Sequence, residues 1–356
     1  MPTDPEAFRD AVTVALEEFF VSRRPVVDAV GPAYATVVDE LEQFVLRGGK
    51  RVRPSFAWLG WLGARGEETA MPVLRACAAL ELVQACALVH DDIIDSSATR
   101  RGHPTVHVAF AQRHRAHGWS GDPRAYGDAV AILLGDLALA WADDMVSESG
   151  LDYAAAARLA PVWSAMRTEV LGGQLLDITG EVTGDESEQT ALRIDRYKTA
   201  AYTIERPLHL GAALADADAD LIAAYRGFGT DIGIAFQLRD DLLGVFGDPA
   251  VTGKPSGDDL REGKHTVLVA LALRRADETD PALARRLRDG LGTDLDDTEV
   301  EAMRAAMVDL GAVDEVERRI ADLTERGLRT LDASTTAPDA KAPLRDLALA
   351  ATRRVT

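Results

Sequence analysis

The chain has 356 residues, of which 47% are hydrophobic and 6% aromatic, and its formal net charge is -19. This length and apolar content suffice for a large buried core, built as one large domain or two ordinary ones. The acidic excess argues against a general nucleic-acid binder, because a phosphate backbone requires a broad basic face on its partner.

Helical periodicity dominates the chain. Ala-rich and Leu-rich stretches with apolar residues at intervals of three and four recur from residue 7 to residue 330,. We find no series of alternating Val, Ile, Thr and Tyr, no internal repeat and no long linker. The sequence therefore predicts an all-α fold in a single domain over residues 1–356. Loops are expected where Gly, Pro, Ser and Asp gather, at 113–127, 179–189, 247–263 and 332–343,.

The N-terminal sequence MPTDPEAFRDAVTVALEEFF has acid where a signal peptide would need a basic start,. The longest apolar run that we identify, AVAILLGDLALAWA at 129–142, is interrupted by Asp136 and is too short to span a bilayer,. Cys77 and Cys86 fall in one predicted helix, about 13.5 Å apart along its axis, so they cannot pair with each other,. We expect no transmembrane segment and a cytoplasmic protein in a reducing compartment.

A basic segment, LRGGKRVRP at 46–54, joins two glycines to Lys50, Arg51 and Arg53. Glycines allow close backbone approach, and alternating basic side chains can bind phosphate oxygens in pairs. Taken alone, KRVR is better explained as a nuclear signal or a solvated basic turn. Together with the acidic motifs below, and with Arg100 and Arg101, it indicates a local anion site.

The next element, ACAALELVQACALVHDDIID, predicts a continuous helix over about 75–95. Asp91 and Asp95 lie one turn apart on the face that also carries Glu81, Gln84 and Leu88,. The pair repels itself unless a cation lies between the carboxylates, and magnesium accepts such a pair together with water and substrate phosphate. The alternative is an acidic helix end facing water, although acid in a last turn opposes the helix dipole.

A second acidic pair occurs in IGIAFQLRDDLLGVFGD at 232–248, where Asp240 and Asp241 precede a loop carrying Lys254 and Lys264. Two separate helices thus each place paired aspartates beside a basic segment. Facing walls of carboxylate could hold several divalent ions around a diphosphate.

Four motifs in this order resemble those of the trans-isoprenyl diphosphate synthases of the polyprenyl synthetase family. They are GGKRVRP, DDIID followed four residues later by RRG, YKTAAYT, and FQLRDD with its trailing lysines, and the resemblance covers about residues 25–290. It implies mostly antiparallel helices around a central cavity between the two acidic helices (the isoprenoid synthase fold), usually as a homodimer. Among these enzymes the chain looks most like a geranylgeranyl diphosphate synthase.

The resemblance also implies residue roles. Asp91 and Asp95 would hold magnesium on the first wall, and Asp240, with Asp241 beside it, would hold a further ion on the second. The allylic diphosphate would be bound by Arg100, Lys198, Thr199, Gln237, Lys254 and Lys264. Isopentenyl diphosphate would be bound by Lys50, Arg53, Gln84 and Arg101. Of these residues, Asp91, Asp95, Asp240, Lys198 and Arg100 would carry the catalysis.

The family's reaction breaks a carbon–oxygen bond, and metal ions with cationic side chains stabilise the charge that grows on the leaving diphosphate. The allylic cation then adds to isopentenyl diphosphate, and the released diphosphate takes up the proton. One residue departs from the pattern: DDLLG places Gly244 where relatives usually have a third aspartate. Asp248 follows one turn later, but FGDP is expected to end the helix before it.

Product length should depend on the residues below Asp91, namely Ala87, Cys86 and Val83. One helical turn, about 5.4 Å, is comparable to one isoprene unit. Small residues at 86 and 87 favour a product longer than farnesyl diphosphate, and we expect geranylgeranyl diphosphate. The alternatives are a farnesyl or longer-chain (C25 and above) synthase, or a non-catalytic subunit of a heteromeric synthase. A terpene cyclase is disfavoured, because it needs no second diphosphate site.

Overall fold

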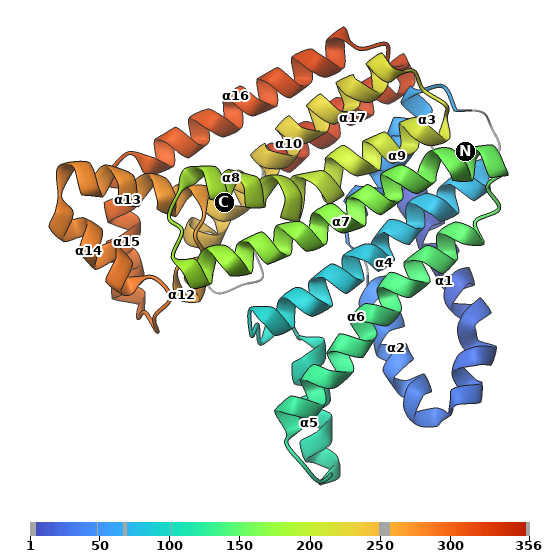
Figure 1. The fold of residues 1–356 in the computed structure, drawn as a ribbon, viewed down its shortest axis with the longest axis horizontal. Helices are drawn as coiled ribbons and strands as arrows, with labels where there is room; N and C mark the ends of the chain where they lie inside the picture. The colour runs from blue at the N-terminus through green and yellow to red at the C-terminus, as the bar shows by residue number, and fades with distance from the viewer. Residues whose placement is uncertain (1–4, 48, 67–69, 101, 249–256, 354–356) are drawn as a thin grey trace. The chain divides into compact units, whose positions relative to one another are not determined.

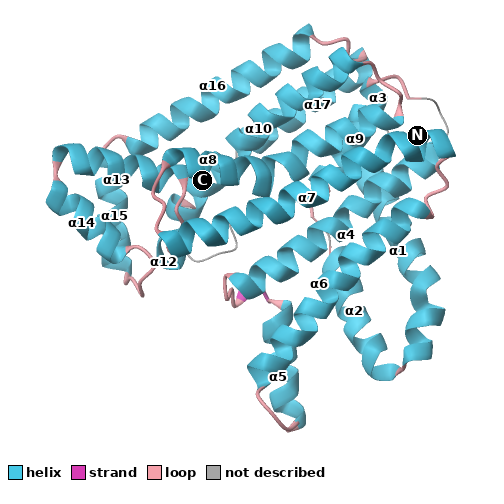
Figure 2. Ribbon diagram, viewed as in Figure 1, coloured by secondary structure: helices cyan, strands magenta, loops and turns pink. Residues whose placement is uncertain are grey.

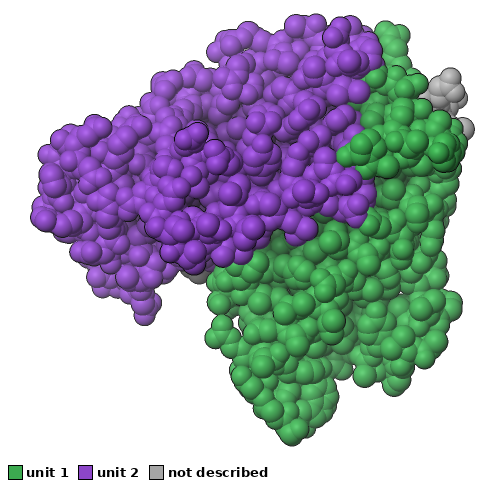
Figure 3. Space-filling model, viewed as in Figure 1, with its two compact units in different colours: residues 1–161, 210–217 green, residues 162–209, 218–356 purple. Residues whose placement is uncertain are grey.

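The computed structural model describes residues 5–47, 49–66, 70–100, 102–248 and 257–353. Helices make up nearly all of these ranges (Figures 1 and 2), which confirms the all-α prediction. The strands among them are β1 (Thr99–Arg100) and β2 (His103–Pro104), an antiparallel pair. The chain divides into two compact units, Met1–Pro161 with Leu210–Ala217, and Val162–His209 with Asp218–Thr356 (Figure 3). The single domain over 1–356 stays a prediction.

The first unit is built around α4. Its helices are α1 (Pro5–Val30), α2 (Pro32–Leu46), α3 (Val52–Gly63), α4 (Ala70–Ile94), α5 (Val106–His117), α6 (Pro123–Ser147) and the start of α7 (Tyr153–Thr183). Helices α1, α2, α3 and α6 all pack against α4, whose Leu80 and Leu82 are fully buried. Helix α4, which carries the first acidic group at its end, is therefore anchored in the core of this unit.

Helix α4 is also the segment most like a membrane span. Residues Met71–Ile94 are long and apolar enough to cross a bilayer. The segment that most resembles a bilayer span is therefore α4, and not the run at 129–142. Its most apolar window is 72% buried within the structure, as is typical of the core helix of a soluble protein.

The loop predicted at 113–127 is shorter than expected. Helix α5 continues to His117 and stops where Gly118 adopts a left-handed conformation (φ 61°), a common helix ending,. Helix α6 begins at Pro123, and the Asp122 side chain accepts a hydrogen bond from the Arg124 amide,. The loop is therefore 118–122, because residues 113–117 belong to α5 and residues 123–127 belong to α6.

The second unit holds the remaining helices. They are the rest of α7, then α8 (Glu188–Ile194), α10 (Ala219–Phe246), α12 (Asp258–Glu262), α13 (Val267–Thr279), α14 (Pro281–Gly290), α15 (Asp297–Asp309), α16 (Ala312–Ala333) and α17 (Pro338–Thr352). Helix α9 (Arg206–Leu214) begins in this unit and ends in the first. Helix α10 packs along α16. The expected loops at 179–189 and 332–343 shrink to 184–187 and 334–337. Helix α8 begins at a Ser187 side-chain cap, and α17 begins with a proline in its first turn,.

A π-helix, η1 (Asp195–Glu205), interrupts the regular helices and contains the YKTAAYT motif. It lies between α7 and α10 at two glycines. A Cβ at Gly173 would stand 2.2 Å from the Lys198 amide nitrogen, and one at Gly233 would stand 2.5 Å from the Ala200 Cβ. Both neighbouring helices thus approach η1 more closely than any side chain would allow. π-helical turns are rare and occur often at functional sites.

Candidate active site

The first acidic group lies at the end of α4. The Asp95 amide donates to the Asp91 carbonyl oxygen over 2.8 Å, so the helical turn extends through Asp95. Both side chains are half-buried. The predicted spacing of one turn between Asp91 and Asp95 is confirmed, and both carboxylates belong to the same helix end.

Asp92 and Arg100 form a pair that the sequence analysis did not assign. The short β1–β2 hairpin carries Arg100, whose Nε donates to Asp92 Oδ1 over 2.8 Å and whose Nη2 donates to Asp91 Oδ2 over 3.3 Å. Asp92 is only 1% exposed, and burial raises the pKa of its carboxyl although Arg100 opposes the rise. Arg100 thus holds two adjacent carboxylates in place and lies beside the predicted metal ligand.

The basic segment at 46–54 contains buried arginines as well as an exposed lysine. Arg51 has a left-handed conformation (φ 49°) at the start of α3, which costs a residue with a side chain about 1 kcal/mol,. Arg51 is 3% exposed, and its guanidinium donates to Glu81 Oε2 over 2.5 Å and to the Val45 carbonyl over 3.0 Å. Arg51 therefore links α2 and α4, while Lys50 is exposed and Arg53 is buried in the first turn of α3.

The residues below Asp91 face two directions. Cys86 Sγ lies 3.8 Å from His90 Nδ1, and His90 Nε2 lies 3.1 Å from the Ile132 carbonyl of α6. Burial raises the pKa of the Cys86 thiol to about 12, and Asp136 of α6 adds to the shift. Cys86 thus faces α6, as a core residue. Ala87 is half-buried, as is Gln84, the residue one turn before Leu88 on the Asp91 face, while Val83 is buried.

The second acidic group lies in the last turns of α10. Asp240 is half-buried and Asp241 is only 4% exposed. Gln237 Nε2 donates to Asp241 Oδ1 over 2.7 Å, but burial, followed by the nearby Asp259 carboxylate, raises the pKa of Asp241 to about 8. Its other oxygen, Oδ2, is buried and has no hydrogen-bond partner among the described residues. A buried carboxylate with an unused oxygen suits a cation.

Two further carboxylates, absent from the sequence analysis, lie beside this group. Asp195, at the start of η1, is buried, and burial with the charges of Asp241 and Asp177 raises its pKa well above the usual range. Lys198 Nζ lies 2.5 Å from Asp177 Oδ2 of α7. Thr199 follows on the same π-helix and is half-buried. No motif indicated Asp177 or Asp195, because their proximity depends on how η1 packs against α7.

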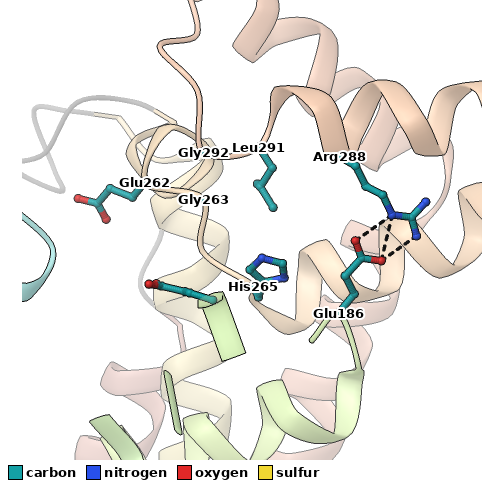
Figure 4. Close-up of a pocket in the computed structure, with 8 residues that line it drawn as sticks. Glu186, Glu262, Gly263, His265, Arg288, Leu291 and Gly292 are labelled. Carbon is teal, nitrogen blue, oxygen red and sulfur yellow. Dashed lines mark hydrogen bonds and ion pairs between the residues drawn. The ribbon is translucent and has the colours of Figure 1, made fainter. Parts of the chain in front are cut away.

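Lys264 is held by acidic residues of α12, the helix that ends just before it. Its Nζ lies 2.9 Å from Glu262 Oε2 and 3.9 Å from Asp259 Oδ1. A cavity of about 250 Å³ opens beside this segment, lined by Glu262, His265 and the ion pair Glu186–Arg288 among others (Figure 4). Its lining is strongly charged, so this cavity does not suit a prenyl chain.

The carboxylates of the two acidic groups fit magnesium when water and substrate phosphate supply the remaining ligands. Within the described ranges, no group of three or more His, Cys, Asp or Glu residues stands ready to hold a metal ion. Magnesium does not require one, because it typically binds one or two carboxylates with water and substrate phosphate. Asp91 with Asp95, and Asp240 with Asp241, offer only oxygen ligands. Arg101 and Lys254 lie outside the described residues, so their predicted roles stay predictions.

Comparison with known proteins agrees with these motifs. The family model "Polyprenyl synthetase" matches residues 35–307. A geranylfarnesyl diphosphate synthase of Aeropyrum pernix is 36% identical over 282 residues, which cover 78% of this chain and 81% of that protein. A geranylgeranyl diphosphate synthase of Mycobacterium tuberculosis is 40% identical over 208 residues, 58% of this chain and 54% of that one.

A solved structure is similar over nearly the whole length. The geranylgeranyl pyrophosphate synthase of Corynebacterium glutamicum, complexed with isoprenyl diphosphate and magnesium, is 50% identical, with a TM-score of 0.96 over 99% of this chain and 100% of that one. A second, from Pyrococcus horikoshii, is 26% identical with a TM-score of 0.81 over 98% of each chain. The chain therefore belongs to the polyprenyl synthetase family, the isoprenyl diphosphate synthases.

Proposed function

We propose that this enzyme condenses isopentenyl diphosphate head-to-tail with an allylic diphosphate, in a magnesium-dependent reaction that releases diphosphate and yields geranylgeranyl diphosphate. The observation that carries the proposal is the retention of both acidic groups in a chain 50% identical to a geranylgeranyl pyrophosphate synthase. Loss of the carboxylates or lysines, as expected of a non-catalytic subunit, is not found at Asp91, Asp95, Asp240, Lys198 or Lys264.

The acidic groups would hold the metal that the reaction requires. Asp91 and Asp95 would bind magnesium at the end of α4, and Asp240 with Asp241 would bind a further ion at the end of α10. When bound, these ions neutralise the charge that develops on the departing diphosphate. Arg100 keeps the Asp91 carboxylate in place through its hydrogen bonds and adds a positive charge near the same oxygens.

The remaining cations would bind the two diphosphates. Lys198 and Lys264 each pair with a carboxylate of the second unit. On binding diphosphate, each lysine would exchange this carboxylate for a phosphate oxygen. In the first unit, Lys50 is exposed at the start of α3, and Gln84 presents an amide on the α4 face that also carries Asp91. These residues would bind isopentenyl diphosphate, together with Arg53.

The C20 product rests on residue size. The half-buried Ala87 is one turn below Asp91, and the buried Val83 is one turn further down. Neither carries a ring that would stop a growing chain after fifteen carbons. A C25 product is the second candidate, since the Aeropyrum pernix relative is a geranylfarnesyl diphosphate synthase.

A second copy of the chain would cover the exposed face of α6. Ile132 and Leu133 are 48% and 66% exposed there, although neighbouring residues of the same helix are buried. Such apolar side chains side by side suit an interface between identical subunits. A Leu133→Asp variant should therefore elute later than the native protein in size-exclusion chromatography.

The free thiols of Cys77 and Cys86 and the buried α4 fit an enzyme of the cytoplasm,.

The decisive experiment incubates the purified protein alone with isopentenyl diphosphate, magnesium and each allylic primer in turn, and separates the products by chromatography. We expect a single main C20 product. Absence of turnover with every primer would sink the proposed activity. A main product of fifteen or twenty-five carbons would retain the activity and correct the chain length.

A further inference from the structure

Two consecutive residues of opposite charge lie where η1 ends, and they pair with different helices. Glu205 is 2% exposed and accepts hydrogen bonds from Arg226 Nε and Thr230 Oγ1 of α10, each over 3.0 Å. Arg206 is 8% exposed, and its Nε donates to Glu169 Oε2 of α7 over 2.8 Å, while its Nη2 donates to the other oxygen of the same carboxylate. The acid thus binds one neighbouring helix and the base binds the other.

The backbone that carries these two side chains has the wide turn of a π-helix. The Arg206 amide donates to the Ala201 carbonyl oxygen, whereas an α-helical turn would use the Tyr202 carbonyl,. The backbone is also in close contact with α10, since a Cβ at Gly229 would stand 2.5 Å from the Glu205 Cα. The end of η1 is therefore fixed against α10 by shape as well as by charge.

The two ion pairs together distinguish the π-helical winding from an α-helical one. An α-helical winding would shift the end of the segment by one residue, which turns its side chains by about 100° around the axis. Glu205 would then take the place of Arg206 and meet the Glu169 carboxylate. The apolar Ile204 would lie opposite the Arg226 guanidinium. Facing like charges are costly, and fixing register is the best-attested role of buried ionic groups.

We propose that Glu205 and Arg206 are positioning residues, which hold η1 in its π-helical register and thereby place Lys198 and Thr199 for the allylic diphosphate. The segment is π-helical from Asp195 to Glu205, so a change of winding at its end alters the hydrogen bonds around Lys198 and Thr199 as well. The inference rests on the proposed function, which makes Lys198 a ligand of that diphosphate.

A matched control on α10 separates positioning from stability. Asp231 is 8% exposed, and Arg326 of α16 donates to both of its carboxylate oxygens, over 2.8 and 2.6 Å. This pair joins two helices of the second unit, as Glu205 and Arg226 do, but it includes no residue of η1. The variants to compare are Glu205→Gln, Arg206→Gln, the milder Thr230→Val, which removes one donor from Glu205, and the control Asp231→Asn.

The readouts are the Michaelis constants of both substrates, the melting temperature, and hydrogen exchange of the backbone amides of 195–206. We expect Glu205→Gln and Arg206→Gln to raise the Michaelis constant of the allylic substrate about tenfold or more, because misplacement of a binding group by about 1 Å can cost 10²-fold. The constant of isopentenyl diphosphate should stay native, and exchange within 195–206 should become faster. Thr230→Val should change the same quantities by less.

The control Asp231→Asn should lower the melting temperature by a similar amount and leave both Michaelis constants and the exchange of 195–206 native. A native allylic constant in folded Glu205→Gln or Thr230→Val protein overturns the inference. So does an equal rise of that constant in Asp231→Asn. If the native chain shows no turnover, the proposed function fails by itself, and exchange of 195–206 in Glu205→Gln against Asp231→Asn still decides whether the ion pair holds the register.

Discussion

Gly173 of α7 and Lys198 of η1 are in backbone contact. A Cβ at position 173 would lie 2.2 Å from the Lys198 amide nitrogen and 2.6 Å from the Tyr197 carbonyl carbon. These neighbours are backbone atoms, so they cannot rotate away as the end of a long side chain could. The absence of a side chain at Gly173 therefore determines where the π-helix, and with it the Lys198 ammonium, is held.

Gly173→Ala should displace η1 and lower both stability and activity. Overpacking of this kind costs about 1–3 kcal/mol, and we expect kcat/KM to fall at least about tenfold, because misplacement of a substrate-positioning group by about 1 Å can cost 10²-fold. The matched control is Gly172→Ala, since no atom lies within 4 Å of a Cβ there. Urea unfolding and steady-state kinetics measure the two effects. Equal behaviour of the two variants would contradict the role of Gly173.

Asp91→Ala and Asp240→Ala should each reduce turnover by at least about 10²–10³-fold, the typical loss when one electrostatic contributor to a transition state is removed. Both variants should remain helical by circular dichroism, because each side chain is only half-buried. Excess chelator should abolish native activity, and added magnesium should restore it. Near-native turnover in either folded variant, or in chelator, would show that the metal assignment is wrong.

Arg100→Gln and Arg101→Gln should raise different Michaelis constants, that of the allylic substrate for the first and that of isopentenyl diphosphate for the second. Arg100→Gln should also destabilise the fold by about 1–3 kcal/mol, because it leaves the buried Asp92 carboxylate without its charged donor,. Initial rates with each substrate varied in turn, plus denaturant unfolding, measure these effects. Equal effects on both constants would indicate one shared anion pocket.

Ala87→Phe should shorten the main product toward fifteen carbons, because a ring one turn below Asp91 limits chain growth. Cys86→Phe should behave differently. Cys86 faces α6 through His90, so a ring there should cost about 1–3 kcal/mol by overpacking the α4–α6 contact. Product chromatography and melting temperatures distinguish the variants. An unchanged long product from a folded Ala87→Phe enzyme would place the limit elsewhere.

His209 should make the fold sensitive to mild acid. Burial, followed by the charges of Arg206 and Arg226, lowers the pKa of His209 from 6.5 to about 4. Between pH 6.5 and about pH 4 the unfolded chain binds a proton at His209 that the folded chain does not. The contribution of His209 to the free energy of unfolding is therefore fully present above pH 6.5 and is lost as the pH falls toward 4. From pH 7.5 to pH 5 the native chain should lose about 2 kcal/mol relative to His209→Gln. Urea unfolding at both pH values measures the difference, and parallel curves would refute it.

The sequence was sufficient for the helical fold and for the spacing within each acidic motif. Asp91 and Asp95 could be placed one turn apart because helical periodicity alone determines which residues share a face. The end of α10 before Asp248 was also predicted correctly from FGDP, since the helix stops at Phe246.

What the sequence could not supply was contact between residues on different elements. Asp177 and Asp195 adjoin the second acidic group only because η1 is π-helical and two glycines admit it between α7 and α10. Arg51 looked like one more anion ligand, yet it is buried against Glu81. A left-handed backbone at an arginine carries no recognisable signal in a single sequence.

The interleaving of the two units along the chain has a consequence for synthesis. The first unit includes Leu210–Ala217, and a Cβ at Gly211 in that segment would stand 1.9 Å from the Ala57 carbonyl oxygen of α3. The ribosome must therefore synthesise Val162–His209, which belong to the second unit, before Leu210–Ala217 are available to complete the first unit. No single truncation yields either half intact. Folding of the nascent N-terminal half must wait for a segment that arrives late.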